Sequence, residues 1–268
     1  MQRREFLAAS AAAAVGLVAS QVGHAAEGDS SRMLIELRIY NFANAEKQNA
    51  FAAFLGKTAV PAFNRAGVEP VGAFKLLAKD NGALHLSQDS TDLYVALPYK
   101  NAQTLIELED KLAGDQEYQQ AGKEILSAPT KDPAYTRYQS SLLYAFPQFP
   151  TVQVPNHSPD RLIQLRRYES HNRERAIKKV KMFNEGGELA VFKRSGMTGV
   201  FFGESLIGDK LPNLTYMLSF ENDEAQKQGW AAFGRDPEWK KLSKDEEYKD
   251  TVSTITNLLL RPVDGSQI

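Results

Sequence analysis

The sequence predicts an α+β protein made of two similar β-α-β-β-α-β units that follow each other along one chain. The main observation is an internal repeat, because four sequence blocks occur twice and in the same order. Such a repeat indicates that one structural unit was duplicated. The second observation is that strand-like alternation of apolar and polar residues gives way to helical spacing at the same places in both copies. The paired blocks are Glu36–Tyr40 with Gln164–Tyr168, Ala62–Gly67 with Val191–Gly196, Leu93–Gln103 with Thr215–Gln226, and Gly114–Tyr118 with Arg235–Trp239.

The first unit, residues 33–146, begins with a strand and a long helix. Apolar and polar residues alternate from Glu36 to Tyr40, which predicts a strand with one apolar face. Asn44 can cap the helix that follows, Pro61 is expected at a break late in this helix, and Gly67 ends it. The rest of the unit is predicted to contain strands at 71–77, 93–97 and 142–146, with a helix capped by Asn101 before the last of them.

The second unit, residues 160–262, repeats this order. Its elements are predicted as strands at 162–168, 200–206, 214–220 and 254–260, and helices at 172–194 and 222–233. The first of these helices should be interrupted near Gly186 and Gly187, and Asp236 with Pro237 should begin a further helix. Residues 147–159 hold four prolines and no periodic pattern, which is typical of a linker.

Each unit therefore has the ferredoxin-like order of elements. Helices cover only one face of such a four-stranded sheet, so the other face also needs a partner. The prediction is that the two units pack sheet against sheet, with helices outside and a barrel-like interior between them.

The first 25 residues carry the features of an export signal. Arg3 and Arg4 precede an apolar stretch from 8 to 19, and Gly23 and Ala25 provide small residues at a cleavage site. This pattern is typical of a twin-arginine (Tat) signal, which predicts a periplasmic protein. No later stretch is long and apolar enough to span a membrane, so no membrane span is expected.

Charge and cysteine content exclude several classes of function. Removing residues 1–25 takes two of the 32 basic residues and one of the 33 acidic ones, which leaves a net charge of −2. A nucleic-acid-binding protein would have a basic excess, so nucleic acid is not an expected partner. The chain has no cysteine, which excludes cysteine nucleophiles, thiolate zinc sites and iron–sulfur clusters.

The motifs ELRIY, AFNRAG, VFKRSG, GVFFGE, PNLTYML and DPEWKKL resemble the NIPSNAP family of the dimeric α+β barrel superfamily. The resemblance covers about residues 33–262 and is closer in the second unit. It implies the barrel fold described above but little about activity. Relatives by fold include small monooxygenases, haem-degrading and chlorite-decomposing enzymes, and binding proteins, and a fold does not imply a function.

The first candidate site consists of two Arg–Tyr pairs, because Arg38 and Tyr40 align with Arg166 and Tyr168. We expect the apolar face of each first strand under the helices, which would turn both pairs into the barrel. An interior arginine needs a counter-charge, and a bound carboxylate or phosphate could supply it. The alternative is pairing within the protein, with Glu36, Glu204 or another buried acid.

The second candidate site is Glu169 with His171, between a strand and its helix. A glutamate beside a histidine can orient the imidazole for general-base catalysis. The alternative is a helix cap at Ser170 or Asn172 with a solvated histidine.

No metal site or cofactor is expected, because the histidines lack ligand spacing, although one axial histidine for haem stays a minor alternative. The histidines outside the export signal are His85, His157 and His171.

The leading hypothesis is binding of a small anionic or aromatic molecule in the cavity between the sheets. Arg38, Tyr40, Arg166 and Tyr168 would line this cavity, with Glu169 and His171 at its rim. One alternative is a cofactor-independent monooxygenase or isomerase-type enzyme in the same cavity, with His171 as base. Another is an assembly module that acts through its outer surfaces and forms homo-oligomers. The sequence does not decide whether the protein is an enzyme.

Overall fold

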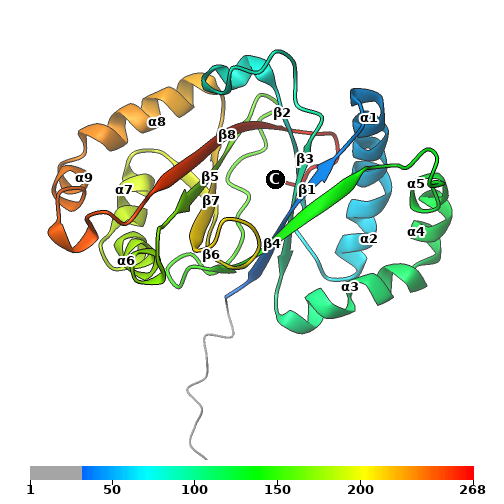
Figure 1. Ribbon diagram of the computed structural model, residues 1–268, viewed down its shortest axis with the longest axis horizontal. Helices are drawn as coiled ribbons and strands as arrows, with labels where there is room; N and C mark the ends of the chain where they lie inside the picture. Colours follow the sequence, from blue (N-terminus) through cyan, green and yellow to red (C-terminus); the bar gives the residue numbers. More distant parts are fainter. Residues whose placement is uncertain (1–31) are drawn as a thin grey trace, which may run out of the picture. The chain divides into compact units, whose positions relative to one another are not determined.

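The computed structural model describes residues 32–268, which contain eight strands in one closed antiparallel barrel with helices on two flanks (Figure 1). The predicted export signal at residues 1–25 lies outside the described residues. The strand order around the barrel is β1-β3-β2-β8-β5-β7-β6-β4. Within residues 32–268, no helix combines the length and apolarity needed to cross a bilayer.

The elements before residue 146 follow the predicted order. Asn44 and Asn101 cap their helices by accepting hydrogen bonds from the backbone N–H groups of Lys47 and Thr104, as predicted. Pro61 lies in the first turn after a short π-helical segment, which confirms the expected break, because proline lacks the N–H that a continuous α-helix needs. The elements are β1 (Leu34–Asn41), α1 (Ala45–Phe54), η1 (Leu55–Ala59), α2 (Val60–Arg65), β2 (Gly72–Leu76), η2 (Ala78–Asp80), η3 (Gly82–Leu84), β3 (Leu93–Tyr99), α3 (Ala102–Gly114), α4 (Gln116–Ala121), α5 (Lys123–Leu126) and β4 (Arg137–Ala145).

The elements after residue 160 also match the prediction. The long helix is interrupted where expected, and Gly187 has a φ of 88°, a left-handed conformation that glycine adopts without strain. The elements are β5 (Leu162–Glu169), α6 (Arg173–Asn184), α7 (Glu188–Arg194), β6 (Thr198–Ile207), β7 (Asn213–Phe220), α8 (Asp223–Arg235), α9 (Pro237–Leu242), η4 (Glu246–Tyr248) and β8 (Thr254–Pro262).

Two seams join the N-terminal and C-terminal halves into one barrel. Strand β2 pairs with β8, and β4 pairs with β6, so the last strand of each half pairs with the edge strand of the other. The halves have matching strand orders, β4-β1-β3-β2 and β8-β5-β7-β6. The expected sheet-to-sheet packing is therefore a single hydrogen-bonded barrel. Closure removes the free edges that two separate sheets would expose.

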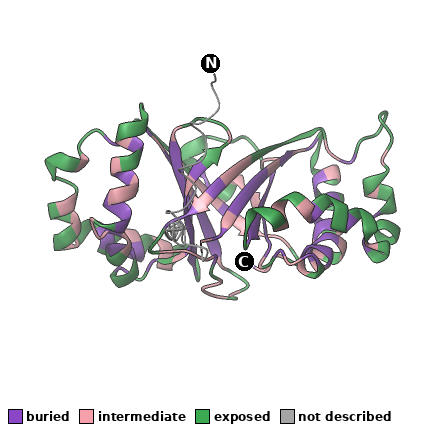
Figure 2. Ribbon diagram, turned by 90° about the horizontal axis from the view of Figure 1, so that it is seen from below, coloured by how far each residue is buried: buried purple, intermediate pink, exposed green. Residues whose placement is uncertain are grey.

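The apolar face of each first strand points into the barrel, which is the reverse of our prediction. Ile35 and Leu37 of β1 and Ile163 and Leu165 of β5 belong to one buried interior cluster. The polar face, with Tyr40 in the first half and Tyr168 in the second, packs beneath the helices. Figure 2 shows both layers, with buried strands between helices whose outward sides are exposed.

Candidate functional site at the polar end of the barrel

The predicted ligand residues Arg38 and Tyr40 do not line the barrel. The Tyr40 ring lies 4.8 Å from the Phe51 ring of α1, centroid to centroid, and this places it in the helix layer. Alternation along β1 puts Arg38 on the same outer side. The physical reason for the reversal is that both faces of a barrel strand are buried, so a polar face can lie under helices when neighbouring side chains hydrogen-bond to it, as Tyr99 of β3 and Ser140 of β4 do to Glu36.

Arg38 already has a counter-charge within the protein. Its Nε donates a hydrogen bond of 2.8 Å to Oε1 of Glu36, and the two form a buried ion pair. Tyr99 and Ser140 also donate to this carboxylate, at 2.7 and 2.6 Å. Burial alone would raise the pKa of Glu36, but the hydrogen bond and charge of Arg38 outweigh it and lower this pKa below its usual value. The alternative of internal pairing therefore holds for Arg38.

Arg166, the counterpart of Arg38, has a different environment. The position of Glu36 is taken by Gln164, which accepts from Trp230 Nε1 and donates to Asn257, both at 2.6 Å. The Arg166 guanidinium lies 4.5 Å from the centroid of the Trp230 ring, a cation–π contact. Its Nε is buried and has no hydrogen-bond partner among residues 32–268. The neutral glutamine thus gives Arg166 no adjacent carboxylate of the kind that pairs with Arg38, and the acid on which the charge of Arg166 acts is Glu188.

Tyr168 belongs to a buried polar cluster beneath α6 and α7. Its hydroxyl lies 2.9 Å from the hydroxyl of Tyr216. Beside it, Lys179 donates to Glu188 at 2.8 Å, and both side chains are almost fully buried. Burial raises the pKa of Glu188, against the opposing effects of Lys179 and Arg166. This cluster lies behind the barrel wall, so Tyr168 does not face the interior.

The polar side chains that do face the interior include Arg167 and Glu169 of β5. In the strand register Arg167 lies between Thr215 of β7 and Thr256 of β8, on the same face as Leu165. Arg167 Nε lies 3.5 Å from Oε1 of Glu169. Both atoms are buried, and neither makes a hydrogen bond within residues 32–268. The pair is therefore close enough to attract but not satisfied as hydrogen-bonding groups.

Further polar groups surround this pair. Lys210 Nζ lies 3.9 Å from Glu169, and Arg167 Nη2 donates to Thr256 at 3.5 Å. Burial raises the pKa of Tyr94 to about 12, with Asp92 adding to the rise and the positive charge of Arg167 opposing it. Tyr94 is thus a neutral phenol at physiological pH, close enough to Arg167 to sense its charge.

The interior of the barrel is filled mainly by apolar side chains. This cluster includes Phe201, Val152 and Ile268, which are all buried. Thr215 and Ser205, near Arg167, instead hydrogen-bond to Asn213 Oδ1 at 3.2 and 2.6 Å. Polar side chains therefore gather around Arg167 at this end of the barrel, while Arg161, which donates to Ile268 O, and Ser219, which accepts from Asn156, are polar groups at the other end.

Glu169 and His171 are close in sequence but have different partners. Glu169 forms ion pairs with Arg167 and Lys210, while His171 is exposed. Asn172 caps α6 by accepting from the Arg175 N–H, which agrees with the helix-cap alternative. The general-base role of His171 stays a prediction.

Arg167 is a site residue outside the predicted set, and the sequence carries one signal for it. The aligned blocks ELRIY and QLRRY place Arg167 where the first half has Ile39. A charge in an otherwise apolar position of a strand indicates a special local role. Among the described residues, no group of three or more His, Asp or Glu side chains is arranged to hold a metal ion.

Comparison with solved structures identifies relatives of this barrel. A candidate monooxygenase from Fusobacterium nucleatum is 8% identical, with a TM-score of 0.58 over 87% of this chain and 93% of its own. A candidate monooxygenase from Lactobacillus acidophilus is 14% identical, with a TM-score of 0.54 over 87% of this chain and 97% of its own. At these identities the similarity shows a shared fold only.

A NIPSNAP-like domain protein from Burkholderia xenovorans is 17% identical, with a TM-score of 0.38 over 41% of this chain and 91% of its own. No curated protein matches the sequence. The family model described as NIPSNAP matches residues 163–267. The segment that matches the NIPSNAP family model thus contains the barrel strand that carries Arg167.

Proposed function

We propose that the protein binds a small organic anion at the polar end of the barrel. The observation that carries the proposal is the pair of buried, unsatisfied atoms, Arg167 Nε and Glu169 Oε1, 3.5 Å apart. Buried polar atoms normally have partners, so a ligand is a reasonable source for the missing ones. A carboxylate would accept from Arg167, and a ligand hydroxyl would donate to Glu169.

Two cationic side chains beside Glu169 can pair with an anion. Arg167 and Lys210 lie 3.5 and 3.9 Å from the Glu169 carboxylate, while the negative charge of Asp92 acts on Tyr94. Tyr94, with a pKa raised to about 12, keeps its proton and offers a hydrogen-bond donor. The preferred ligand class is therefore a small hydroxy acid, aliphatic or aromatic.

The four ligand residues predicted from the sequence have structural roles in this proposal. Arg38 is neutralised by Glu36, and Tyr40 packs in the helix layer. Arg166 and Tyr168 lie on the outer face of the strand that presents Arg167, where they position it. In this proposal none of the four residues contacts the ligand directly.

A second candidate function is a cofactor-independent monooxygenase or isomerase-type enzyme at the same end of the barrel. The fold shared with two candidate monooxygenases over 87% of the chain favours it. Glu169 or His171 would serve as the base. An assembly module remains the third alternative, acting through the outer surfaces of the helices and homo-oligomerisation.

We also propose that the chain arose by duplication of one unit and that it is exported to the periplasm. The two halves with matching strand order would be tandem ferredoxin-like units, at 33–146 and 160–262, joined by the linker at 147–159. The twin arginine of the sequence would direct export to the periplasm. The matching strand orders support the first statement, and the motif at Arg3 and Arg4 supports the second.

The test is calorimetric titration of the full chain with para-hydroxybenzoate and with benzoate, which lacks the hydroxyl. We expect wild type to bind para-hydroxybenzoate more tightly, and Arg167→Ala to lose at least about tenfold in affinity, the effect of a lost charged hydrogen bond. Arg235→Ala is the matched control, since Arg235 is exposed on α8 and, within residues 32–268, hydrogen-bonds only to Ala231 O of its own helix. Equal affinities of wild type and Arg167→Ala for both probes would refute the proposal.

Turnover separates the enzyme alternative from simple binding. Oxygen consumption, or conversion of a bound acid that wild type shows and His171→Ala or Glu169→Gln lacks, would establish catalysis at this end of the barrel. Conversion that persists in both variants would exclude these residues as the base.

A further inference from the structure

A second site lies outside the barrel wall. A pocket of about 580 Å³ opens between α7, the start of β6 and linker residues 148–155. Volumes of this order are typical of sites for small organic molecules. The pocket is separate from Arg167, which faces the barrel interior.

The walls of this pocket are mainly aromatic and apolar. Phe149 of the linker meets Phe202 of β6 edge to face, with ring centroids 5.0 Å apart. Phe192 of α7 lies 5.7 Å from the same Phe202 ring. Leu189 and Met197 complete the apolar lining. Such a surface suits a flat or aliphatic ligand body.

The backbone around the pocket is well held, so the aromatic wall is preformed. The Gln153 N–H donates to Val200 O at 2.8 Å, which ties the linker to β6. A Cβ at Gly199 would lie 2.4 Å from a Phe202 ring atom and 3.0 Å from a Phe149 ring atom. The absence of a side chain at this position therefore allows both rings to approach. A preformed wall lowers the cost of ordering the site on binding.

Lys193 gives the pocket its only charged side chain among the described lining residues. It is exposed and forms no ion pair within residues 32–268, whereas the adjacent Arg194 pairs with Asp236 at 2.6 Å. No aspartate or glutamate of the described chain lines the pocket. The site thus combines an aromatic wall with one uncompensated positive charge at its edge.

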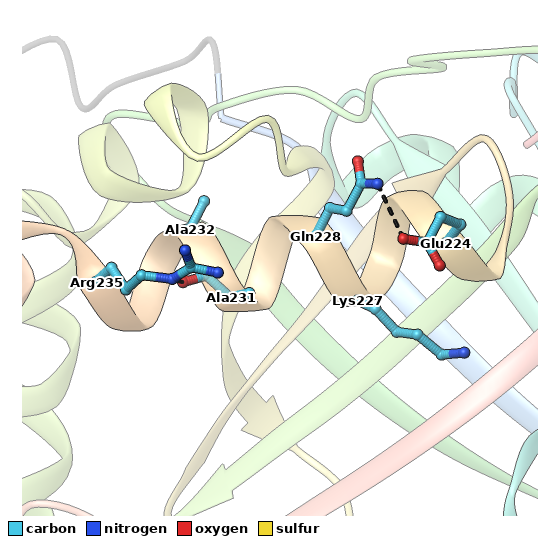
Figure 3. A pocket seen from close by; sticks show the side chains of 6 residues that line it. All are labelled: Glu224, Lys227, Gln228, Ala231, Ala232 and Arg235. Carbon is cyan, nitrogen blue, oxygen red and sulfur yellow. Dashed lines mark hydrogen bonds between the residues drawn. The ribbon is translucent and has the colours of Figure 1, made fainter.

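We infer that this pocket binds an amphipathic organic anion, with an aromatic or aliphatic body against Phe149, Phe192 and Phe202 and a carboxylate or sulfonate beside Lys193. The pocket on the outer face of α8 provides a contrast (Figure 3). It is lined by Lys227 and Arg235 but has no aromatic wall, and its Glu224 already accepts from Gln228 at 2.9 Å.

The test uses two fluorescent probes with the full chain. Anilinonaphthalene sulfonate carries an aromatic body and a negative charge, and N-phenylnaphthylamine is its neutral analogue. We expect saturable binding of both probes. Lys193→Gln should weaken the sulfonate about two- to fivefold, as for one solvent-exposed ion pair, and leave the neutral probe unchanged. Lys227→Gln, in the α8 pocket, is the matched control and should change neither affinity.

A pocket-filling variant locates the binding. Ala190 lines the pocket and is exposed, so Ala190→Trp adds bulk there without disturbing the buried core. We expect this variant to lose the saturable signal of both probes while its circular dichroism and melting temperature match wild type. The inference is overturned by no saturable binding in wild type, by probe affinities unchanged in a folded Ala190→Trp, or by equal effects of Lys193→Gln and Lys227→Gln. The two lysine variants decide the question even if Ala190→Trp does not fold.

Discussion

Replacing Lys179 by methionine should strongly destabilise the protein, because Glu188 would lose its only ion-pair partner within residues 32–268. The ammonium and carboxylate are 2.8 Å apart, and their side chains are 5% and 1% exposed. Solvent therefore cannot replace the missing charge. Lys179 also contacts Met182 Sδ at 3.2 Å, and methionine at position 179 would keep part of that apolar packing.

The expected loss follows from the burial of the pair. Removing one partner of a buried ion pair costs about 3–5 kcal/mol, because the other charge is left uncompensated. This is a large part of the roughly 5–15 kcal/mol that stabilises a domain. For a chain of this size it corresponds to a fall of roughly 6–20 °C in melting temperature.

The loss should also depend on pH. The pKa of Glu188 is raised above 4.5 by burial, and Lys179 opposes that rise. In Lys179→Met the pKa of Glu188 in the folded protein rises further, so the folded state binds a proton at Glu188 more strongly than the unfolded state does. The stability linked to this proton is fully present below the unfolded pKa of about 4.5 and is lost as pH increases through the folded pKa. The variant should therefore fall further below wild type at about pH 8 than at about pH 5.

Urea unfolding of wild type and variant at these two pH values measures both effects. The matched control is Lys178→Met on the same helix, which removes an exposed pair with Glu174 and should cost only about 0.3–0.5 kcal/mol. A double variant, Lys179→Met with Glu188→Leu, should recover most of the loss. Equal costs for Lys179→Met and Lys178→Met, or the same loss at both pH values, would refute the reasoning.

Three further predictions test the fold and the export signal. Arg38→Met should destabilise by about 3 kcal/mol, since Glu36 loses its buried partner. Arg166→Met should cost less, because it removes a cation–π contact worth about 0.5–1 kcal/mol and a charge that acts on Glu188, which keeps its ion pair with Lys179; urea unfolding compares the two variants, and a larger cost at Arg166 would contradict our account. Phe201→Ala removes a fully buried ring from the barrel interior and should cost about 3–5 kcal/mol in the same assay, and a cost below about 1 kcal/mol would mean that this interior is not packed. Replacing Arg3 and Arg4 by lysine should retain the uncleaved chain in the cytoplasm, which fractionation and immunoblotting measure, and normal periplasmic recovery would exclude a Tat signal.

The order and approximate bounds of the strands and main helices could be predicted from the sequence because each rests on local chemistry. Asn44 and Asn101 cap helices wherever those helices lie, and Pro61 breaks an α-helix by lacking an N–H. The NIPSNAP resemblance is confirmed for residues 163–267.

The direction of the strand faces could not be predicted in the same way. Alternation shows that Ile35 and Arg38 lie on opposite faces, but in a barrel with outer helices both faces are buried. Which face turns inward depends on partners distant in sequence, such as Tyr99 and Ser140 for Glu36. The interior position of Arg167 could not be predicted for the same reason, since alternation alone assigns it to the face expected beneath the helices.

The two seams, β2 with β8 and β4 with β6, make a barrel from one covalent chain. In a barrel closed by two identical subunits, each mutation is copied by symmetry and appears at both equivalent positions. Here Ile39 and Arg167 occupy corresponding places on β1 and β5, and one is apolar while the other is charged. In a single chain, one half can therefore keep an apolar side chain that packs while the other half carries a charged one. Selection can act on each half separately.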